Sequence, residues 1–291
     1  MKNAQRLLLT VFLGLLPLLS GCGQSPAPAA ALTVVFVNVS YPGSNPQAIA
    51  KTIAAPLEQE LHGAAGLIRS ETYSNNGSYV AQLYFDSTMD SAALEELVQE
   101  RLDLAKPKLP ADAQIMSVSV KPPKAALNPT QVTIALLDHK NRDWQIRQIH
   151  AEAILKQFAA ANVLNNPTMY PTAEKQVLFM TDSDKLARLG LSKAELNAAM
   201  PPNARDMPID ELQKLTVGEN KIPLSSLVEF HEELAPTTIY RVNQFPAIRI
   251  TGVASPGSTI LDAGAKSVEL AETELQRLQF KNYVIENLSG K

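Results

Sequence analysis

The chain has 291 residues and a formal net charge of −3, with 45% hydrophobic and 19% charged residues. Such a composition is typical of a globular protein with one large domain or two smaller ones. The slightly acidic balance argues against a nucleic-acid partner, because binding nucleic acid requires clustered Lys and Arg side chains. Cys22 is the single cysteine, so a disulfide bond within the chain and a cysteine-based metal site are excluded.

The N-terminus has the features of a bacterial lipoprotein signal. Lys2 and Arg6 precede an apolar run, Leu7 to Leu19, that is shorter than the roughly 20 residues a bilayer span needs. The run leads into Leu-Ser-Gly-Cys, a lipobox pattern in which the thiol of Cys22 is acylated. The alternative is an ordinary secretory signal with an incidental cysteine. We expect residues 1–22 to form the signal and the acylation site.

Small residues dominate positions 23–32, which we expect to form a tether between the lipid and a folded body. An acyl chain holds a protein at a membrane surface without spanning the bilayer. The expected location is therefore the bacterial cell envelope, with the body facing the periplasm. Gly23 after the lipidated cysteine gives no acidic signal for inner-membrane retention, so the outer membrane is somewhat favoured.

Residues 33–123 carry signals for a strand, a helix, two strands, a helix and a strand. Every second residue of the first strand is valine, and Asn45 before Pro46 is a typical helix start. Pro56 inside that helix predicts a kink, since it lacks the N–H of one backbone hydrogen bond. This order predicts an α+β sandwich of ferredoxin-like (βαββαβ) type. The expected strands are 33–40, 67–74, 78–86 and 114–120, and the expected helices are 46–62 and 90–105.

The segment Lys121-Pro122-Pro123-Lys124 predicts a boundary, after which the pattern starts again. We expect a second ferredoxin-like subdomain from residues 124–205 and 235–291, with a small docking-like insertion at 206–234. Its expected strands are 130–137, 176–181, 247–253 and 282–286, its long helices are 142–160 and 259–278, and short helices lie near 184–189 and 192–200.

The sequence contains no motif for catalysis or metal binding that we recognise. The four histidines lack the spacing of metal ligands on a helix, and we interpret each as a surface or partly buried side chain. We interpret Trp144 as a packing residue at a helix start. The glutamates on the predicted helices are interpreted as solvated faces: Glu58, Glu60, Glu95 and Glu96. We therefore expect a non-enzymatic protein without metal or cofactor, with an unrecognised enzyme as an alternative.

Several segments form an ordered set that covers nearly the whole chain after the signal. They are Val39–Pro46 with Tyr-Pro-Gly-Ser, Thr52–Gly63 with Ala-Pro-Leu-Glu, Ile222–Val228 with Ile-Pro-Leu, Tyr240–Ala247 with Arg-Val-Asn-Gln-Phe-Pro-Ala, and Ser255–Gly257. The set resembles the periplasmic porter domain of resistance-nodulation-division (RND) efflux transporters. The resemblance also accounts for Pro56, which the helical periodicity leaves unexplained.

The resemblance implies a substrate cleft lined by aromatic and apolar side chains. By position it assigns Tyr170, beside Met169, to a candidate groove for amphipathic small molecules. The alternative is that Tyr170, which lies between two prolines, only covers a loop.

The chain departs from the family pattern at both ends and in the insertion. A lipobox signal stands in place of the family's first membrane helix, and the sequence stops at Gly290-Lys291, where the second would begin. The family's proton-relaying intramembrane carboxylates would then be missing, so we expect the chain not to drive transport alone. Only about Met200 to Arg205 stands for the family's long docking arm, and Asn243-Gln244 replaces its usual Asn-Gly.

Together these features predict a non-enzymatic, membrane-tethered module associated with RND-type efflux. It would act as an accessory or substrate-binding partner of an RND transporter or of its periplasmic adaptor. The alternative is a relic, or an envelope-assembly lipoprotein without a transport role.

Overall fold

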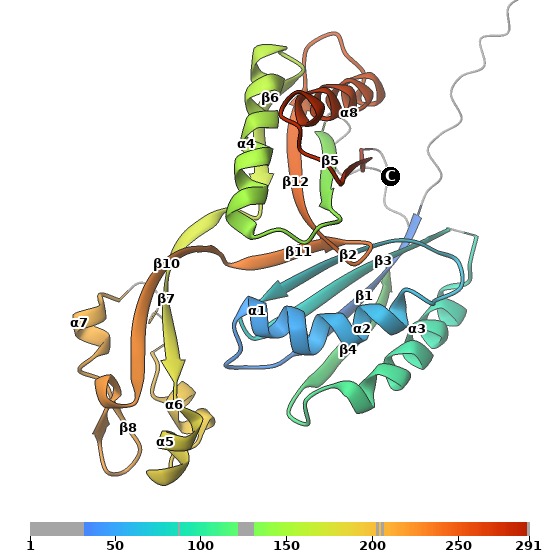
Figure 1. Ribbon diagram of the computed structural model, residues 1–291. Coiled ribbons are helices and arrows are strands. Elements are labelled where there is room, and N and C mark those ends of the chain that lie inside the picture. Colours follow the sequence, from blue (N-terminus) through green and yellow to red (C-terminus); the bar gives the residue numbers. More distant parts are fainter. Residues whose placement is uncertain (1–31, 87, 122–130, 202–203, 205–206, 290–291) are drawn as a thin grey trace, which may run out of the picture.

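The computed structural model describes residues 32–86, 88–121, 131–201, 204 and 207–289 (Figure 1). The predicted signal with Cys22, nearly all of the tether and the predicted boundary at 122–124 lie outside these residues. Within the described part of the chain, no helix combines the length and the apolar character that crossing a membrane requires.

The first half of the chain forms a four-stranded antiparallel sheet with helices on one face. Its strands are β1 (Leu32–Ser40), β2 (Leu67–Asn75), β3 (Ser78–Asp86) and β4 (Gln114–Lys121), in the order β2-β3-β1-β4. Val35, Val37 and Val39 are buried, as their alternation predicts. They share a core with Leu57 of α2 (Ala55–Leu61) and Leu94 of α3 (Ser91–Ala105), so both helices cover the same face.

The helix that contains Pro56 passes through the proline without a break. It begins as α1 (Pro46–Ile49), where the Asn45 side chain accepts a hydrogen bond from the N–H of Ala48, as a helix cap does. One π-helical turn, Ala50–Ala54, joins α1 to α2. Because Pro56 has no N–H to give to the preceding turn, a wider turn at this place accommodates the missing bond.

The second half repeats the strand order of the first. Its strands are β5 (Gln131–Asp138), β6 (Leu164–Tyr170), β12 (Phe245–Ala254) and β13 (Tyr283–Asn287), arranged β13-β5-β12-β6 and all antiparallel. The helices α4 (Trp144–Ala160) and α8 (Ile260–Arg277) complete it, and Ile154 and Ala271 share a buried core with Ile134 and Ile250 of the sheet.

The insertion in the second half begins earlier in the chain than the sequence predicts. The strand expected at 176–181 is β7 (Ala173–Thr181), which pairs with β10 (Val228–Pro236) and not with the second sheet. The two strands form a ribbon that carries a small lobe away from both sheets (Figure 1). The lobe contains α5 (Ser183–Arg188), α6 (Lys193–Ala198), α7 (Ile209–Leu212), β8 (Thr216–Val217), β9 (Ile222–Pro223) and a 3-10 turn at Leu224–Ser226.

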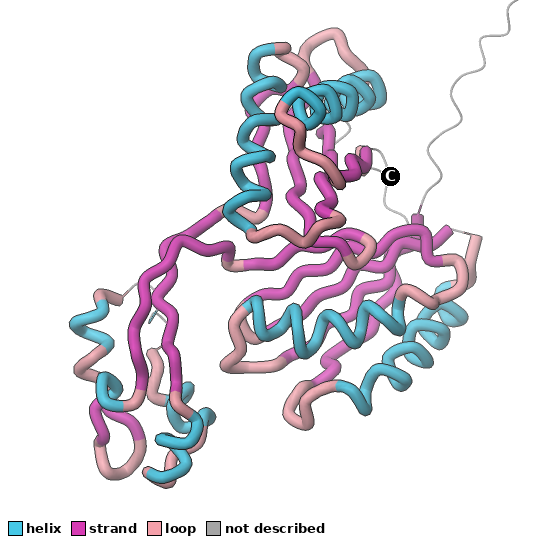
Figure 2. The backbone as a smooth tube through the Cα atoms, viewed as in Figure 1, coloured by secondary structure: helices cyan, strands magenta, loops and turns pink. Residues whose placement is uncertain are grey.

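The two sheets are joined, whereas the sequence predicts two separate sandwiches. β11 (Thr238–Val242) pairs with β2 on one side and with the start of β12 on the other. The result is one nine-stranded sheet, β13-β5-β12-β11-β2-β3-β1-β4 with β6 beside β12, whose strands can be followed from one half to the other in Figure 2. The strand pairs of this sheet are antiparallel, and helices and strands together are compatible with the expected α+β class.

Candidate functional site

Two of the segments that carry the resemblance meet where the sheets join. Glu58 of α2 is 3% exposed, so its interpretation as part of a solvated helix face is wrong. Its Oε1 accepts a hydrogen bond of 2.7 Å from the Thr72 hydroxyl, and its Oε2 lies 3.0 Å from Nε of Arg241 on β11. Burial raises the pKa of Glu58, while Arg241 and Thr72 act in the opposite direction. The ion pair therefore connects α2, which covers the first sheet, to β11, the strand that joins the two sheets.

The turn between β11 and β12 provides a second connection. Asn243 exchanges backbone and side-chain hydrogen bonds with Ser70: its N–H donates to the Ser70 carbonyl, and its Oδ1 accepts from the Ser70 N–H, both at 3.0 Å. Its Nδ2 donates to Glu286 Oε1 on β13 at 3.2 Å. One side chain thus connects β2, β11 and β13.

Gln244 adopts a left-handed backbone conformation in this turn, with φ of 70° after 48° at Asn243. Two-residue hairpin turns of this kind favour Asn-Gly, because only glycine enters the left-handed region without a steric penalty. We expect Gln244→Gly to raise the free energy of unfolding by about 1 kcal/mol. Urea denaturation of both proteins measures the difference. An unchanged or lower stability would show that the weak 3.4 Å bond from Gln244 Nε2 to the Glu58 carbonyl outweighs the strain.

Three tyrosines and an arginine form a cluster at the junction, which we call the tyrosine–arginine cluster: Tyr73, Tyr170, Tyr240 and Arg249. Tyr73 lies 5.2 Å from Tyr240 and 6.2 Å from Tyr170 between ring centroids. The Arg249 guanidinium lies 5.1 Å from the Tyr170 ring centre and 5.6 Å from that of Tyr240. Both distances fall within the range of cation–π attraction. The cluster combines aromatic faces with a cation.

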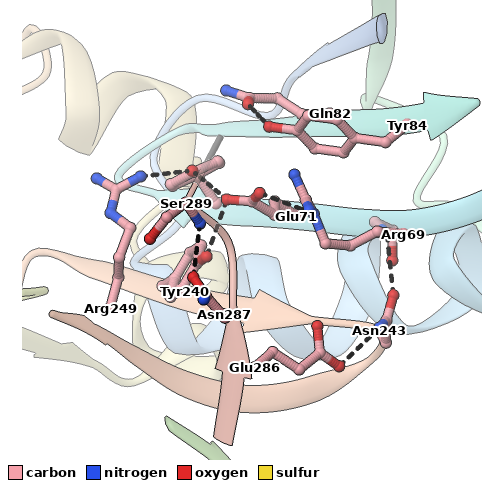
Figure 3. A network of polar contacts seen from close by, with 12 residues as sticks. Arg69, Glu71, Gln82, Tyr84, Tyr240, Asn243, Arg249, Glu286, Asn287 and Ser289 are labelled. Carbon is pink, nitrogen blue, oxygen red and sulfur yellow. Dashed lines mark hydrogen bonds and ion pairs between the residues drawn. The ribbon is translucent and has the colours of Figure 1, made fainter. Parts of the chain in front are cut away.

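Glu71 anchors this cluster to the first sheet (Figure 3). Its Oε2 accepts hydrogen bonds from the hydroxyls of Tyr240, at 2.9 Å, and Tyr73, at 3.3 Å, and its Oε1 lies 3.1 Å from Arg69 Nε. Arg249 in turn donates to the Tyr73 hydroxyl at 3.2 Å. Burial, and then the charge of Glu71, raise the pKa of Tyr240 well above its usual value, so its hydroxyl stays a donor.

The structure places the two predicted groove residues on opposite faces of β6. Successive side chains of a strand point to opposite sides of its sheet. Met169 packs against the core beneath α4 and α8, whereas Tyr170 packs in the tyrosine–arginine cluster and its backbone lies opposite Arg249. Tyr170 is therefore a strand residue rather than a loop cover, and Met169 lies apart from it.

A cavity of about 320 Å³, which we call the junction cavity, adjoins the cluster. It opens where α1, the start of α4, the ends of the ribbon, β11 and β12 come together. Tyr240 belongs to both its wall and the cluster, and Pro171 directly follows Tyr170. The other lining residues are Gln47, Asn141, Arg142, Asp143, Trp144, Gln145, Arg147, Ala235, Pro236, Ile239 and Ala247. A volume near 300 Å³ is at the low end for small-molecule sites.

The chemistry of the junction is suited to binding. In the described residues, no group of three or more His, Cys, Asp or Glu side chains is placed to hold a metal ion. The site instead offers tyrosine rings, small apolar side chains and arginines, a combination that contacts molecules with both apolar and polar parts.

Comparison of the sequence with known proteins identifies a family and several similar proteins. Residues 8–214 match the model of the AcrB/AcrD/AcrF family. The multidrug export protein AcrF of Escherichia coli (strain K12) is 26% identical over 281 residues, which is 86% of this chain and 27% of that protein. The multidrug resistance protein MdtC of Yersinia enterocolitica is 31% identical over 113 residues, 39% of this chain and 10% of that protein.

The chain thus spans about a quarter or less of the length of these relatives. The agreement nevertheless extends over both halves of the chain in the AcrF comparison, and the family match covers well over half of it. The predicted resemblance to RND transporters is confirmed, and the chain belongs to the AcrB/AcrD/AcrF family.

Proposed function

We propose that this chain is a substrate-binding accessory module of an RND-type efflux system. It binds amphipathic small molecules at the junction of its two sheets, performs no enzymatic reaction and leaves the energy-coupled step to a partner transporter. Family membership supports the link to efflux, since the similar proteins are named for multidrug export and multidrug resistance. The proposal includes attachment to an envelope membrane through Cys22, which rests on the lipobox pattern, with the body in the periplasm.

The observation that carries the binding role is the junction cavity beside the tyrosine–arginine cluster. Tyr240 lines the cavity, Tyr170 lies 6.2 Å from Tyr240 between ring centroids, and the Arg249 guanidinium lies within 5.6 Å of both ring centres. Aromatic rings provide a large apolar contact area, and they pack against other rings in offset or edge-to-face arrangements. Residues of α1, the start of α4, β10, β11 and β12 line the cavity, so an occupant would contact both halves of the chain.

Replacing Tyr170 by Ala is expected to weaken binding of a neutral amphipathic probe, N-phenyl-1-naphthylamine, roughly 3- to 10-fold, the loss of one aromatic contact. Fluorescence titration of the purified chain measures the dissociation constant. Phe36→Ala is the matched control, because Phe36 of β1 packs under Lys121 and belongs neither to the cavity wall nor to the tyrosine–arginine cluster beside it. Equal affinities of wild type and Tyr170→Ala would contradict a role of Tyr170.

The accessory role is tested in cells. Cross-linking followed by co-purification should recover an RND transporter or its periplasmic adaptor, and deletion of the gene should lower tolerance to amphipathic drugs. If the chain captures neither partner, binds no amphipathic compound and leaves tolerance unchanged, the efflux role fails and the relic or envelope-assembly alternative replaces it. Metabolic labelling with a fatty acid, compared between wild type and Cys22→Ser, tests the lipid attachment.

A further inference from the structure

We propose that the junction cavity recognises an anionic head group, the carboxylate of a short amphipathic compound, through the N-terminus of α4 and the side chains of Trp144 and Arg147. This inference rests on the proposed function, because it assigns a charge class to the amphipathic ligand. Its evidence is separate and comes from the first turn of α4, which forms part of the cavity wall.

The first element is the N-terminal end of α4, a helix of 17 residues. The unpaired N–H groups of a first helical turn carry a partial positive charge of about half a unit, which favours an anion. Asp143 occupies the N-cap position, yet its side chain makes no capping hydrogen bond. Residues of this first turn line the cavity, so the positive end of the helix faces it.

The second element is a pair of buried donors in the same turn. Trp144 is 9% exposed and Arg147 is 7% exposed, and both line the cavity. Neither the indole Nε1 of Trp144 nor Nε of Arg147 has a hydrogen-bond acceptor within the described chain. Buried N–H donors are nearly always paired, because leaving one unpaired is unfavourable. Carboxylate oxygens of a ligand would supply the acceptors.

The charges around Arg147 leave its guanidinium able to pair with an anionic ligand. Asp138, whose charge acts on Arg147, is buried and already accepts from the backbone N–H groups of Lys140 and Arg142 and from the Arg142 guanidinium. Burial lowers the pKa of Arg147, with the charge of Asp138 opposing this, and a guanidinium stays charged at physiological pH. The carboxylate of Asp143 also lines the cavity but is exposed to solvent, which weakens its effect.

The apolar residues of the cavity wall indicate what the uncharged part of the ligand is. Pro171, Ala235, Ile239 and Ala247 line the cavity together with the ring of Tyr240. An ion without an apolar part would leave this surface unused, whereas a short alkyl or aryl chain would cover it. A carboxylate with a chain of about eight carbons therefore matches both the wall and a cavity of about 320 Å³.

Isothermal titration calorimetry of the purified chain, in buffer without detergent, tests the proposal with four probes of different charge. They are octanoate, octyltrimethylammonium, octyl glucoside and inorganic phosphate. Octanoate should bind at least about 10-fold more tightly than the cationic and neutral octyl compounds and than phosphate. Arg147→Met should weaken octanoate binding by about 10- to 100-fold with little effect on octyl glucoside.

Two further variants keep the test valid if Arg147→Met is unstable. Trp144→Phe keeps an aromatic ring and removes the indole N–H, and should weaken octanoate binding several-fold, whereas Asp143→Asn should strengthen it by removing a repulsive charge. Arg188→Met is the matched control, because Arg188 pairs with Asp182 at an exposed place in the lobe and does not line the cavity. It should leave binding unchanged.

The outcomes separate this inference from the proposed function. Equal binding of octanoate and octyl glucoside, unaffected by Arg147→Met and Trp144→Phe, would overturn the charge preference and leave amphiphile binding intact. Phosphate binding as tight as octanoate binding would overturn it in favour of a site for free anions. If no octyl compound binds, the binding role of the junction fails as a whole.

Discussion

Replacing Arg241 by Met is expected to lower the free energy of unfolding by about 3–5 kcal/mol at neutral pH. The substitution keeps the length of the side chain but leaves the carboxylate of Glu58, which is 3% exposed, without its cation. Removing one partner of a buried ion pair is strongly destabilising, because the remaining charge has lost its hydration and gained nothing in return.

The loss should depend on pH in a defined direction. Burial raises the pKa of Glu58 above 4.5 and Arg241 opposes this, so loss of Arg241 raises it further. A carboxyl group with a higher pKa in the folded than in the unfolded state favours folding when protonated, and this advantage disappears as the pH rises from 4.5 through the folded pKa. Urea denaturation of Arg241→Met should therefore show a smaller loss at about pH 5 than at about pH 8.

The double variant Glu58→Gln with Arg241→Met distinguishes the effect of the buried charge from the effect of the hydrogen bond that Arg241 makes in the turn. Arg241 also donates to the Gln244 carbonyl, and both variants lose that bond. The double variant should recover most of the lost stability and show little pH dependence, since no charge remains buried. If it is as unstable as the single variant at both pH values, Arg241 acts through the turn and the ion pair contributes little.

The elements of the first sheet could be predicted from the sequence because each has a local signal. β1 alternates between core and open face, Asn75-Asn76-Gly77 fits the tight turn between β2 and β3, and Asn45 caps α1 as its position indicates. Local patterns of this kind do not depend on which strand lies next to which. They therefore predict elements well and their assembly less well.

In the second half, local sequence patterns do not predict which strands pair. β6 contains Asn165, Asn166 and Pro167, residues that are rare in strands, and it is a strand because β12 offers it a pairing edge. The sequence of β7 is typical of a strand, but it does not indicate that β7 pairs with β10 instead of with the second sheet. β11 likewise joins two sheets through pairing with β2, which lies far away in the chain.

The candidate site could be predicted only in part, for the same reason. The resemblance pointed to Tyr170, and the structure brings that residue to the junction. Strand alternation then separates Met169 from it. Glu71 and Arg249 have no signal in a single sequence, although four consecutive buried residues of β2, Arg69 to Thr72, depart from simple alternation once the fold is known. The burial of Glu58 had an indirect signal, since its segment and that of Arg241 both carry the family resemblance.

The second large effect is expected for Glu71→Gln, with a loss of about 2–4 kcal/mol in the free energy of unfolding. Glu71 is 4% exposed and accepts hydrogen bonds from Tyr240 and Tyr73 while facing Arg69. Gln keeps the shape of the side chain but carries no charge and has one acceptor oxygen instead of two. With the Gln oxygen in the place of Oε2, both tyrosine hydroxyls keep only a neutral acceptor, and the amide N–H₂ faces Arg69, which loses its charged partner.

Hydrogen exchange locates this effect. β11 joins the two sheets, and its Tyr240 side chain is held by Glu71, so amides of β11 should exchange faster in Glu71→Gln while those of β4, at the far edge, stay protected. Glu60→Gln is the matched control, because Glu60 pairs with Lys108 at the surface and such pairs contribute less than about 1 kcal/mol. Unchanged exchange in β11 would mean that backbone pairing with β2 alone holds the junction. Faster exchange would mean that the polar network sets the position of Tyr240, and thereby one wall of the junction cavity.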